Sequence, residues 1–127
     1  MFDWRRPTNL GVSNGRFAPC KRSPNCVSSQ ADPADRQHYV APIAYQGSIA
    51  ELRKALEELP LATVIREEGN YLYAEFRTPI LRFVDDVEFL LSENLLQVRS
   101  ASRLGRRDFG ANRNRVEQLR SFIQARR

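Results

Sequence analysis

The side chains best suited to chemistry lie together near the end of the chain, between an apolar segment and an amphipathic one. They belong to four residue types that make directional polar contacts: Arg99, Ser100, Ser102, Arg103, Arg106, Arg107, Asp108, Asn112, Arg113 and Arg115. Guanidinium groups bind carboxylate and phosphate through paired, charge-assisted hydrogen bonds. The segment 99–115 therefore indicates either a site for an anion or a network of internal ion pairs.

One interpretation of this segment is an anion-binding site. A helix that begins near Ala111 would offer free backbone amides and the positive end of its dipole, and Arg103, Arg106, Arg107 or Arg113 would add charge-assisted bonds. The candidate ligand-binding residues are Asp85, Ser100, Ser102, Arg103, Asp108, Asn112, Arg113 and Arg115. The sequence also fits a structural network, in which carboxylates and guanidiniums satisfy one another without a ligand. Its members would be Asp85, Asp86 and Asp108 with Arg99, Arg103 and Arg115.

Signals for catalysis are few. The chain has no Gly-x-Ser-x-Gly motif, no phosphate-binding loop and no His-Glu-x-x-His motif, and His38 is its only histidine. Asp85 and Asp86 are neighbours on a predicted strand, so their side chains point to opposite faces and cannot form a matched acid–base pair. We therefore expect a non-catalytic binding or interaction module. The alternative is a hydrolase that uses Ser100 or Ser102 at the same site, with Asp85 or His38 as its base.

Charge is unevenly distributed along the 127 residues, whose net charge is +5. Residues 99–127 hold nine arginines against two acidic residues, a net +7, whereas residues 1–98 have a net charge of −2. An anionic small molecule or an acidic protein surface is therefore the expected partner. A nucleic acid is a weaker alternative, in which Tyr71 and Tyr73 would stack bases on an outward sheet face. Nothing in the sequence indicates a metal, nucleotide or flavin cofactor.

Two cysteines, Cys20 and Cys26, lie six positions apart. With one histidine in the chain they cannot complete a four-ligand structural zinc site. No segment has the roughly 20 apolar residues of a membrane span, and the N-terminus lacks the apolar core of an export signal, so we expect a cytoplasmic location. Free thiols are the default there. A disulfide is also sterically possible, and Lys21 and Arg22 could instead activate a thiol.

The predicted fold is α+β, with an irregular arm at 1–37 that packs on a core domain at 38–127. Pro, Gly, Asn and Ser are frequent in the arm and interrupt any regular period. Its expected apolar anchors are Phe2, Trp4, Leu10, Val12 and Phe17. The core is predicted to begin with an edge strand at 38–44, because Pro42 cannot donate a hydrogen bond to a sheet.

Two amphipathic helices are predicted. Ser48 and Glu51 form a capping box that starts the first, which ends before Pro60. The second spans 111–127. Their buried stripes are Ile49, Leu52, Leu56 and Leu59, and Val116, Leu119, Phe122 and Ile123. The order β-α-β-β-β-β-α favours a single antiparallel sheet of about five strands, with both helices packed on one face.

Two hairpins lie between the helices. The first joins segments 63–68 and 71–77 through the Gly-Asn pair at 69–70, a two-residue loop that favours positive φ. Its inward residues are predicted to be Thr63, Ile65, Leu72, Ala74 and Phe76. The second hairpin joins segments 83–91 and 96–103.

The register of the second hairpin decides which of its side chains face the helices. Pairing Leu91 with Leu96 collects the apolar residues inward and leaves Glu88 opposite Arg99 on the outer face, where opposite charges attract. The inward apolar residues are then Val87, Phe89, Leu91, Leu96 and Val98. A polar cluster continues the inward face beside the 105–112 loop: Asp85, Ser100 and Ser102.

Several motifs carry a resemblance to a known family. They are Asn-Leu-Gly at 9–11, Pro-Cys-x-x-Ser-Pro-Asn-Cys-Val-Ser-Ser, His-Tyr-x-x-Pro-Ile, Phe-Val-Asp-Asp-Val-Glu-Phe and Arg-Ser-Ala-Ser-Arg-Leu-Gly-x-x-Asp-x-Gly-x-Asn-Arg-x-Arg-Val-Glu. Through them the chain resembles the family named domain of unknown function 1499, whose bacterial and plastid-related members include some with export signals. The resemblance implies no assigned activity. The motif residues are Cys20, Asn25, Cys26, Ser28, Ser29, Asp85, Asp86, Arg99, Ser100, Ser102, Arg103, Gly105, Asp108, Asn112, Arg113 and Arg115.

Overall fold

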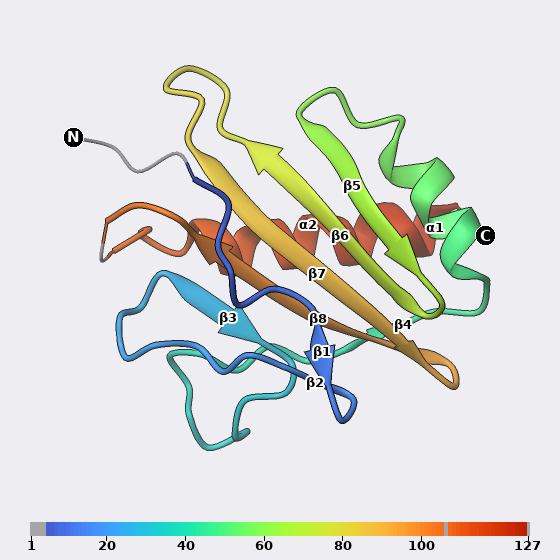
Figure 1. Cartoon of the computed structure of the whole chain (residues 1–127), viewed down its shortest axis with the longest axis horizontal. Coiled ribbons are helices and arrows are strands. Elements are labelled where there is room, and N and C mark those ends of the chain that lie inside the picture. The colour runs from blue at the N-terminus through green and yellow to red at the C-terminus, as the bar shows by residue number, and fades with distance from the viewer. Residues whose placement is uncertain (1–4, 106, 127) are drawn as a thin grey trace.

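The computed structural model describes residues 5–105 and 107–126 and has the predicted α+β fold. Within these ranges a six-stranded sheet has the order β3-β8-β7-β6-β5, with β4 also pairing on β8. Both helices pack against one of its faces (Figure 1). The elements are β1 (Val12–Ser13), β2 (Arg16–Phe17), β3 (Cys26–Ser28), β4 (Ile43–Ala44), α1 (Ile49–Leu56), β5 (Ala62–Glu68), β6 (Tyr71–Arg77), β7 (Val84–Ser92), β8 (Leu95–Ser102) and α2 (Ala111–Ala125). None of the described helices is long and apolar enough to cross a membrane.

The N-terminal arm contributes three short strands that the sequence does not predict. β1 and β2 form a small hairpin, and β3 joins the main sheet by pairing with β8, with Cys26 opposite Ala101. Strands of two or three residues are too short to show an alternating pattern. Of the predicted first strand at 38–44, only the last two residues, β4, pair with β8. Pro42, which cannot donate a hydrogen bond to the sheet, directly precedes β4.

The helices begin as the sequence predicts. At α1 the Glu51 amide donates to the Ser48 hydroxyl at 3.1 Å, and the Ser48 amide donates to the Glu51 carboxylate at 3.0 Å. α2 follows Gly110, whose φ of 83° lies in the left-handed region that glycine adopts without steric strain. Arg127, the predicted last residue of this helix, lies outside the described residues. The buried helix side chains are Ile49, Leu52, Ala55, Leu56, Asn112, Val116, Leu119 and Ile123.

The predicted register of the second hairpin is confirmed. Leu91 pairs with Leu96, and Asp85 pairs with Ser102 at the other end. This pairing places four apolar side chains of β7 and β8 in the core: Val87, Phe89, Leu96 and Val98. It also sets the polar cluster of the inward face beside the start of α2.

The first hairpin keeps its two-residue loop but not its predicted inward face. A bulge between Val64 and Arg66 shifts the pairing of β5 by one residue. Ala62 and Val64 therefore pack against the core, whereas Ile65 is exposed. The prediction for Thr63 and Ile65 is wrong because a strand with an extra residue changes faces at the bulge.

The outer sheet face carries Glu88 opposite Arg99, as the register predicts, and it is covered rather than open to solvent. The arm runs across it (Figure 1), and Glu88 and Arg99 are only 0% and 6% exposed. Tyr71 and Tyr73 are buried too, so they cannot stack bases as the nucleic-acid hypothesis requires. Of the expected anchors, Leu10 and Phe17 pack on this face, Val12 is exposed, and Phe2 and Trp4 lie outside the described residues.

Candidate functional site

The polar segment 99–115 is divided between the two faces of the sheet. On the helix face, Asn112 is fully buried and its side chain contacts several polar groups. Its amide nitrogen lies within hydrogen-bond distance of three acceptors: the Asp108 carboxylate at 2.7 Å, the Ser102 hydroxyl at 2.8 Å and the Asn25 carbonyl at 3.2 Å. Its carbonyl accepts from the Ser100 hydroxyl at 2.6 Å. These bonds fix the end of β8 to the start of α2.

The carboxylate of Asp108 occupies the N-terminus of α2. It accepts from the backbone amides of Gly110 at 2.9 Å and Asn112 at 3.0 Å, so the amides predicted to bind an anion already hold an internal one. Burial acts to raise the pKa of Asp108, but the bonds from Asn112 and these amides keep it below its ordinary value. Nearby, Asp85 pairs with Arg115 at 2.5 Å, and burial raises the pKa of Asp85 in spite of this pair.

Arg113 is engaged by backbone groups. Its guanidinium donates to the carbonyls of Tyr39 at 2.8 Å, Arg36 at 3.0 Å and Gln37 at 3.3 Å. With Arg107 it lines a cavity of about 330 Å³ at the joint. Arg106 lies outside the described residues. The joint brings together most of the predicted site, namely Asp85, Ser100, Ser102, Asp108, Asn112 and Arg115.

Arg103 lies on the outer face, in a second network. Its guanidinium donates to Asp86 at 2.9 Å and to Glu75 at 2.6 Å. The Tyr73 hydroxyl lies within hydrogen-bond distance of both carboxylates, 2.5 Å from Asp86 and 2.9 Å from Glu75. The bond to Asp86 is the main cause that raises the pKa of Arg103. Burial acts to raise the pKa of Glu75, but bonds from Arg6, Tyr73 and Arg103 hold it below its ordinary value.

A cavity of about 580 Å³ opens beside this second network. The arm, the 20–26 loop, the end of β8 and the loop that follows it form its walls. Five basic side chains and one acidic side chain line it: Arg5, Arg6, Lys21, Arg99, Arg103 and Asp86. Because Asp86 is bound to Arg103, the remaining charge in the cavity is positive.

Arg99, which lines this cavity, is incompletely satisfied. The Oε1 atom of Glu88 lies 3.7 Å from its Nη1 atom, beyond hydrogen-bond distance. Glu88 Oε1 and Arg99 Nε are buried without a hydrogen-bond partner among the described residues. The other Glu88 oxygen accepts from the Tyr71 hydroxyl at 2.6 Å and the Gly11 amide at 2.7 Å. Burial raises the pKa of Glu88 and lowers the pKa of Arg99, because it disfavours the charged form of each.

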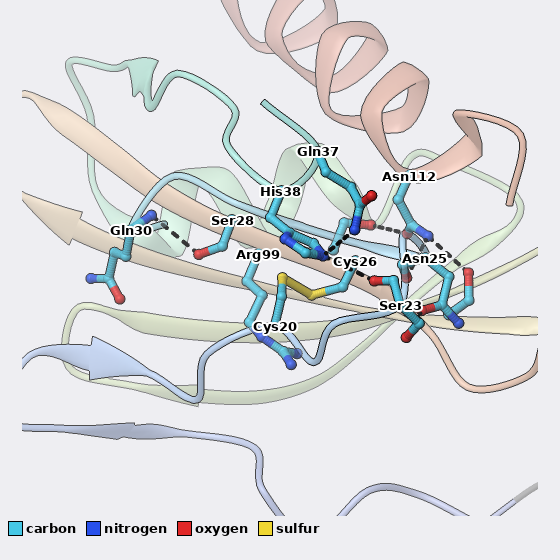
Figure 2. The surroundings of a disulfide bond; sticks show 12 residues. Cys20, Ser23, Asn25, Cys26, Ser28, Gln30, Gln37, His38, Arg99 and Asn112 are labelled. Carbon is cyan, nitrogen blue, oxygen red and sulfur yellow. Dashed lines mark hydrogen bonds between the residues drawn. A yellow bond between two sulfur atoms is a disulfide. The ribbon is translucent and has the colours of Figure 1, made fainter. Parts of the chain in front are cut away.

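A disulfide between Cys20 and Cys26 closes the loop that forms one wall of the cavity (Figure 2). Their Cα atoms lie 5.6 Å apart. From this loop the Ser23 carbonyl lies 2.9 Å from His38 Nε2, while His38 Nδ1 lies 2.8 Å from the Asp35 carboxylate. Burial acts to lower the pKa of His38, but Asp35 and the Ser23 carbonyl raise it above its ordinary value. These acceptors favour the protonated imidazolium.

Two residues of the hydrolase alternative, Ser100 and His38, make contacts within the fold. Ser100 has no exposed surface and its hydroxyl donates to Asn112. His38 contacts Asp35 and the 20–26 loop.

Sequence reasoning does not find the cavity, because the path of the arm across the sheet determines it. The one signal in the sequence is the pairing of Glu88 with Arg99, which places two charges on a face that the arm later covers. The structure contains two pairs of the predicted structural network, namely Asp86 with Arg103 and Asp85 with Arg115.

No curated protein and no solved structure matches the chain. A family model described as "Protein of unknown function (DUF1499)" matches residues 16–123. This match covers most of the chain, including the cysteine loop, the four long strands and nearly all of α2, and it agrees with the motif resemblance. The chain therefore belongs to the DUF1499 family of proteins of unknown function.

Proposed function

We propose that the chain is a non-catalytic module that binds a small anion, through a phosphate or carboxylate group, in the cavity of about 580 Å³ on the outer sheet face. Arg99 carries this proposal. Its guanidinium lines the cavity, and its Nε atom is buried without a hydrogen-bond partner among the described residues. A desolvated charge is costly unless it is paired and hydrogen-bonded, and a guanidinium pairs best with a planar carboxylate or a phosphate.

The other basic side chains of the cavity support this assignment in different ways. Arg6 reaches Glu75 at 2.8 Å with a half-exposed side chain, and Lys21 is exposed, so both can turn toward an anion. Arg103 is bound to Asp86 and Glu75, and we assign it the role of fixing the cavity wall.

The joint at α2 is the alternative place for an anion, and its contacts favour it less. Arg113 is hydrogen-bonded to three backbone carbonyls, and the carboxylate of Asp108 accepts from the helix amides. An external anion would have to displace these internal partners. At Arg99 it would displace no side-chain hydrogen bond that the described part of the chain makes.

The disulfide bears on where this binding takes place. Disulfides form and persist in oxidising compartments and are rare in the cytoplasm. Cys26 lines the cavity and the bond closes its wall. We therefore favour an oxidising location over the cytoplasmic one that the sequence suggests.

Isothermal titration calorimetry with inorganic phosphate and with acetate, at constant ionic strength, tests the proposal. The variants are Arg99→Gln and, as the matched control at the α2 joint, Arg113→Gln. We expect Arg99→Gln to lose at least about tenfold in affinity, since a hydrogen bond to a charged group contributes about 1.5–3 kcal/mol. Arg113→Gln should bind as the wild type does. Circular dichroism confirms that each variant is folded.

Two results would overturn the proposal. One is a wild-type protein that binds neither anion. The other is the reverse pattern, in which Arg113→Gln loses binding and Arg99→Gln retains it, because this would place the anion at the α2 joint.

A further inference from the structure

Three large apolar side chains protrude from one end of the sheet. Ile80 and Leu81, between β6 and β7, are 90% and 66% exposed, and Phe109, between β8 and α2, is 92% exposed. The two loops leave the same end of the sheet, because the Arg103 amide donates to the Val84 carbonyl where β8 ends and β7 begins (Figure 1). The other exposed large apolar side chains of the described residues are only 36–41% exposed: Val12, Leu61, Ile65 and Leu95.

Both loops hold these side chains outward by defined backbone contacts. In the first, the Thr78 amide donates to the Phe83 carbonyl at 2.8 Å and the Arg82 amide donates to the Thr78 carbonyl at 3.1 Å. Arg82 and Phe109 have φ values of 58° and 52°, in the left-handed region that large side chains rarely adopt. Strained positions of this kind persist where the surrounding structure imposes them, and they concentrate at functional sites. The exposure of the tips is therefore part of the folded arrangement.

Positive charge accompanies the apolar tips. Arg82 directly follows Leu81, and Arg107 lies two positions before Phe109. Both arginines are exposed, and neither forms an ion pair with a carboxylate of the described residues. The acidic side chains nearest to them in the sequence are engaged internally: Asp85, Asp86 and Asp108. This end of the sheet thus combines protruding apolar groups with unneutralised positive charge.

We propose that this end of the sheet docks on a lipid bilayer that contains anionic phospholipid. Ile80, Leu81 and Phe109 insert below the headgroups, and Arg82 and Arg107 lie at the level of the phosphates. Two separate tips on hydrogen-bonded loops can each enter between lipids. A folded protein partner is the less favoured occupant, because specific protein interfaces have a packed, continuous core. The proposal does not depend on the anion cavity.

The contributions of the two kinds of residue can be separated. An apolar side chain that leaves water completely raises the partition constant by about tenfold or more. An arginine near an anionic surface raises it by about fivefold. The tips should therefore dominate the affinity, and the arginines should determine its dependence on anionic lipid and on salt.

Vesicle flotation tests the proposal, with phosphatidylcholine vesicles that either contain or lack phosphatidylglycerol. The tip variant combines Ile80→Ser, Leu81→Ser and Phe109→Ser. The charge variant combines Arg82→Gln and Arg107→Gln. The matched control removes three exposed apolar side chains elsewhere: Leu61→Ser, Ile65→Ser and Leu95→Ser. The melting temperature of each variant shows that the fold is intact, and a phosphate titration of each variant is recorded as a separate measurement.

We expect the wild type and the matched control to float with the anionic vesicles and to bind the neutral ones at least tenfold more weakly. The tip variant should lose about a hundredfold or more in affinity, and the charge variant about tenfold or more. A wild type that floats with neither kind of vesicle would overturn the proposal and would favour a protein partner at this end of the sheet. So would a tip variant that floats as the wild type does. Phosphate binding by the tip variant is measured separately, so the membrane-docking proposal and the anion-binding proposal can fail independently.

Discussion

Replacing Arg103 by methionine should destabilise the fold through the carboxylates that it leaves behind. The guanidinium holds Asp86 and Glu75, which are 2% and 5% exposed and share the Tyr73 hydroxyl. Methionine can replace much of the apolar stem of arginine, so little packing is lost. Removing one partner of a buried ion pair costs about 3–5 kcal/mol.

A loss of this size gives a large change in melting temperature. An unfolding entropy of about 2.1 cal/mol/K per residue gives about 270 cal/mol/K for the 127 residues. Each kcal/mol therefore moves the melting temperature by about 4 °C, and we expect a drop of about 11–19 °C at pH 7. Circular dichroism melting measures it. Arg126→Met is the matched control, since its pair with Glu58 is exposed and should contribute no more than about 1 kcal/mol.

The deficit of Arg103→Met should shrink at lower pH. Without the arginine, Asp86 and Glu75 repel each other, so protonation relieves this repulsion and restores stability as the pH falls. In the wild type the pKa of Glu75 is lowered, and its stabilising contribution is lost as the pH falls through that folded-state pKa. The two melting temperatures should therefore approach each other between about pH 7 and pH 4. An unchanged melting temperature at pH 7, or an equal deficit at both pH values, would refute this reasoning.

The remaining predictions concern the α2 joint and the cysteine loop. Asp108→Ala should cost only about 1–2 kcal/mol by thermal melting, because its carboxylate accepts from two backbone amides at the start of α2. Asn112→Ala should cost roughly 3 kcal/mol, because it leaves several polar groups unpaired; equal losses would contradict this. Proton NMR of His38, the only histidine, should show a pKa above its ordinary value, so that its stabilising contribution is lost as the pH rises through that raised pKa; a pKa at or below the ordinary value would count against the contact with Asp35. Cys20→Ser should cost about 2 kcal/mol, from the entropy of the short closed loop, and native protein should have no titratable thiol; two reactive thiols would remove the disulfide from the account.

Much of the helix face was predictable because its signals are local or periodic. The capping box at Ser48 depends on residues three apart, and the register at Leu91 follows from keeping one face apolar. Asp85 was expected beside the 105–112 loop because the register pairs it with Ser102 at the end of β8. Where the surroundings of a residue follow from its position along a single helix or hairpin, the sequence was sufficient to predict them.

The outer face was not predictable in the same way. The burial of Arg99 depends on an arm that lacks periodicity, and the strand that anchors this arm, β3, is only three residues long. The bulge beside Ile65 left no mark in the residue pattern, so the faces of β5 were exchanged at that point. The cavity arises from contacts distant in sequence, such as Arg6 with Glu75. No local pattern specifies such contacts.

The most direct test of anion binding at Arg99 is a crystal structure of the protein soaked in tungstate, a phosphate-like dianion with a strong anomalous signal. We expect the highest anomalous peak in the cavity on the outer face, with its oxygens at hydrogen-bond distance from the Arg99 guanidinium. An empty cavity together with a peak at the N-terminus of α2, beside Asp108 and Arg113, would contradict the account and return the anion to the joint between β8 and α2.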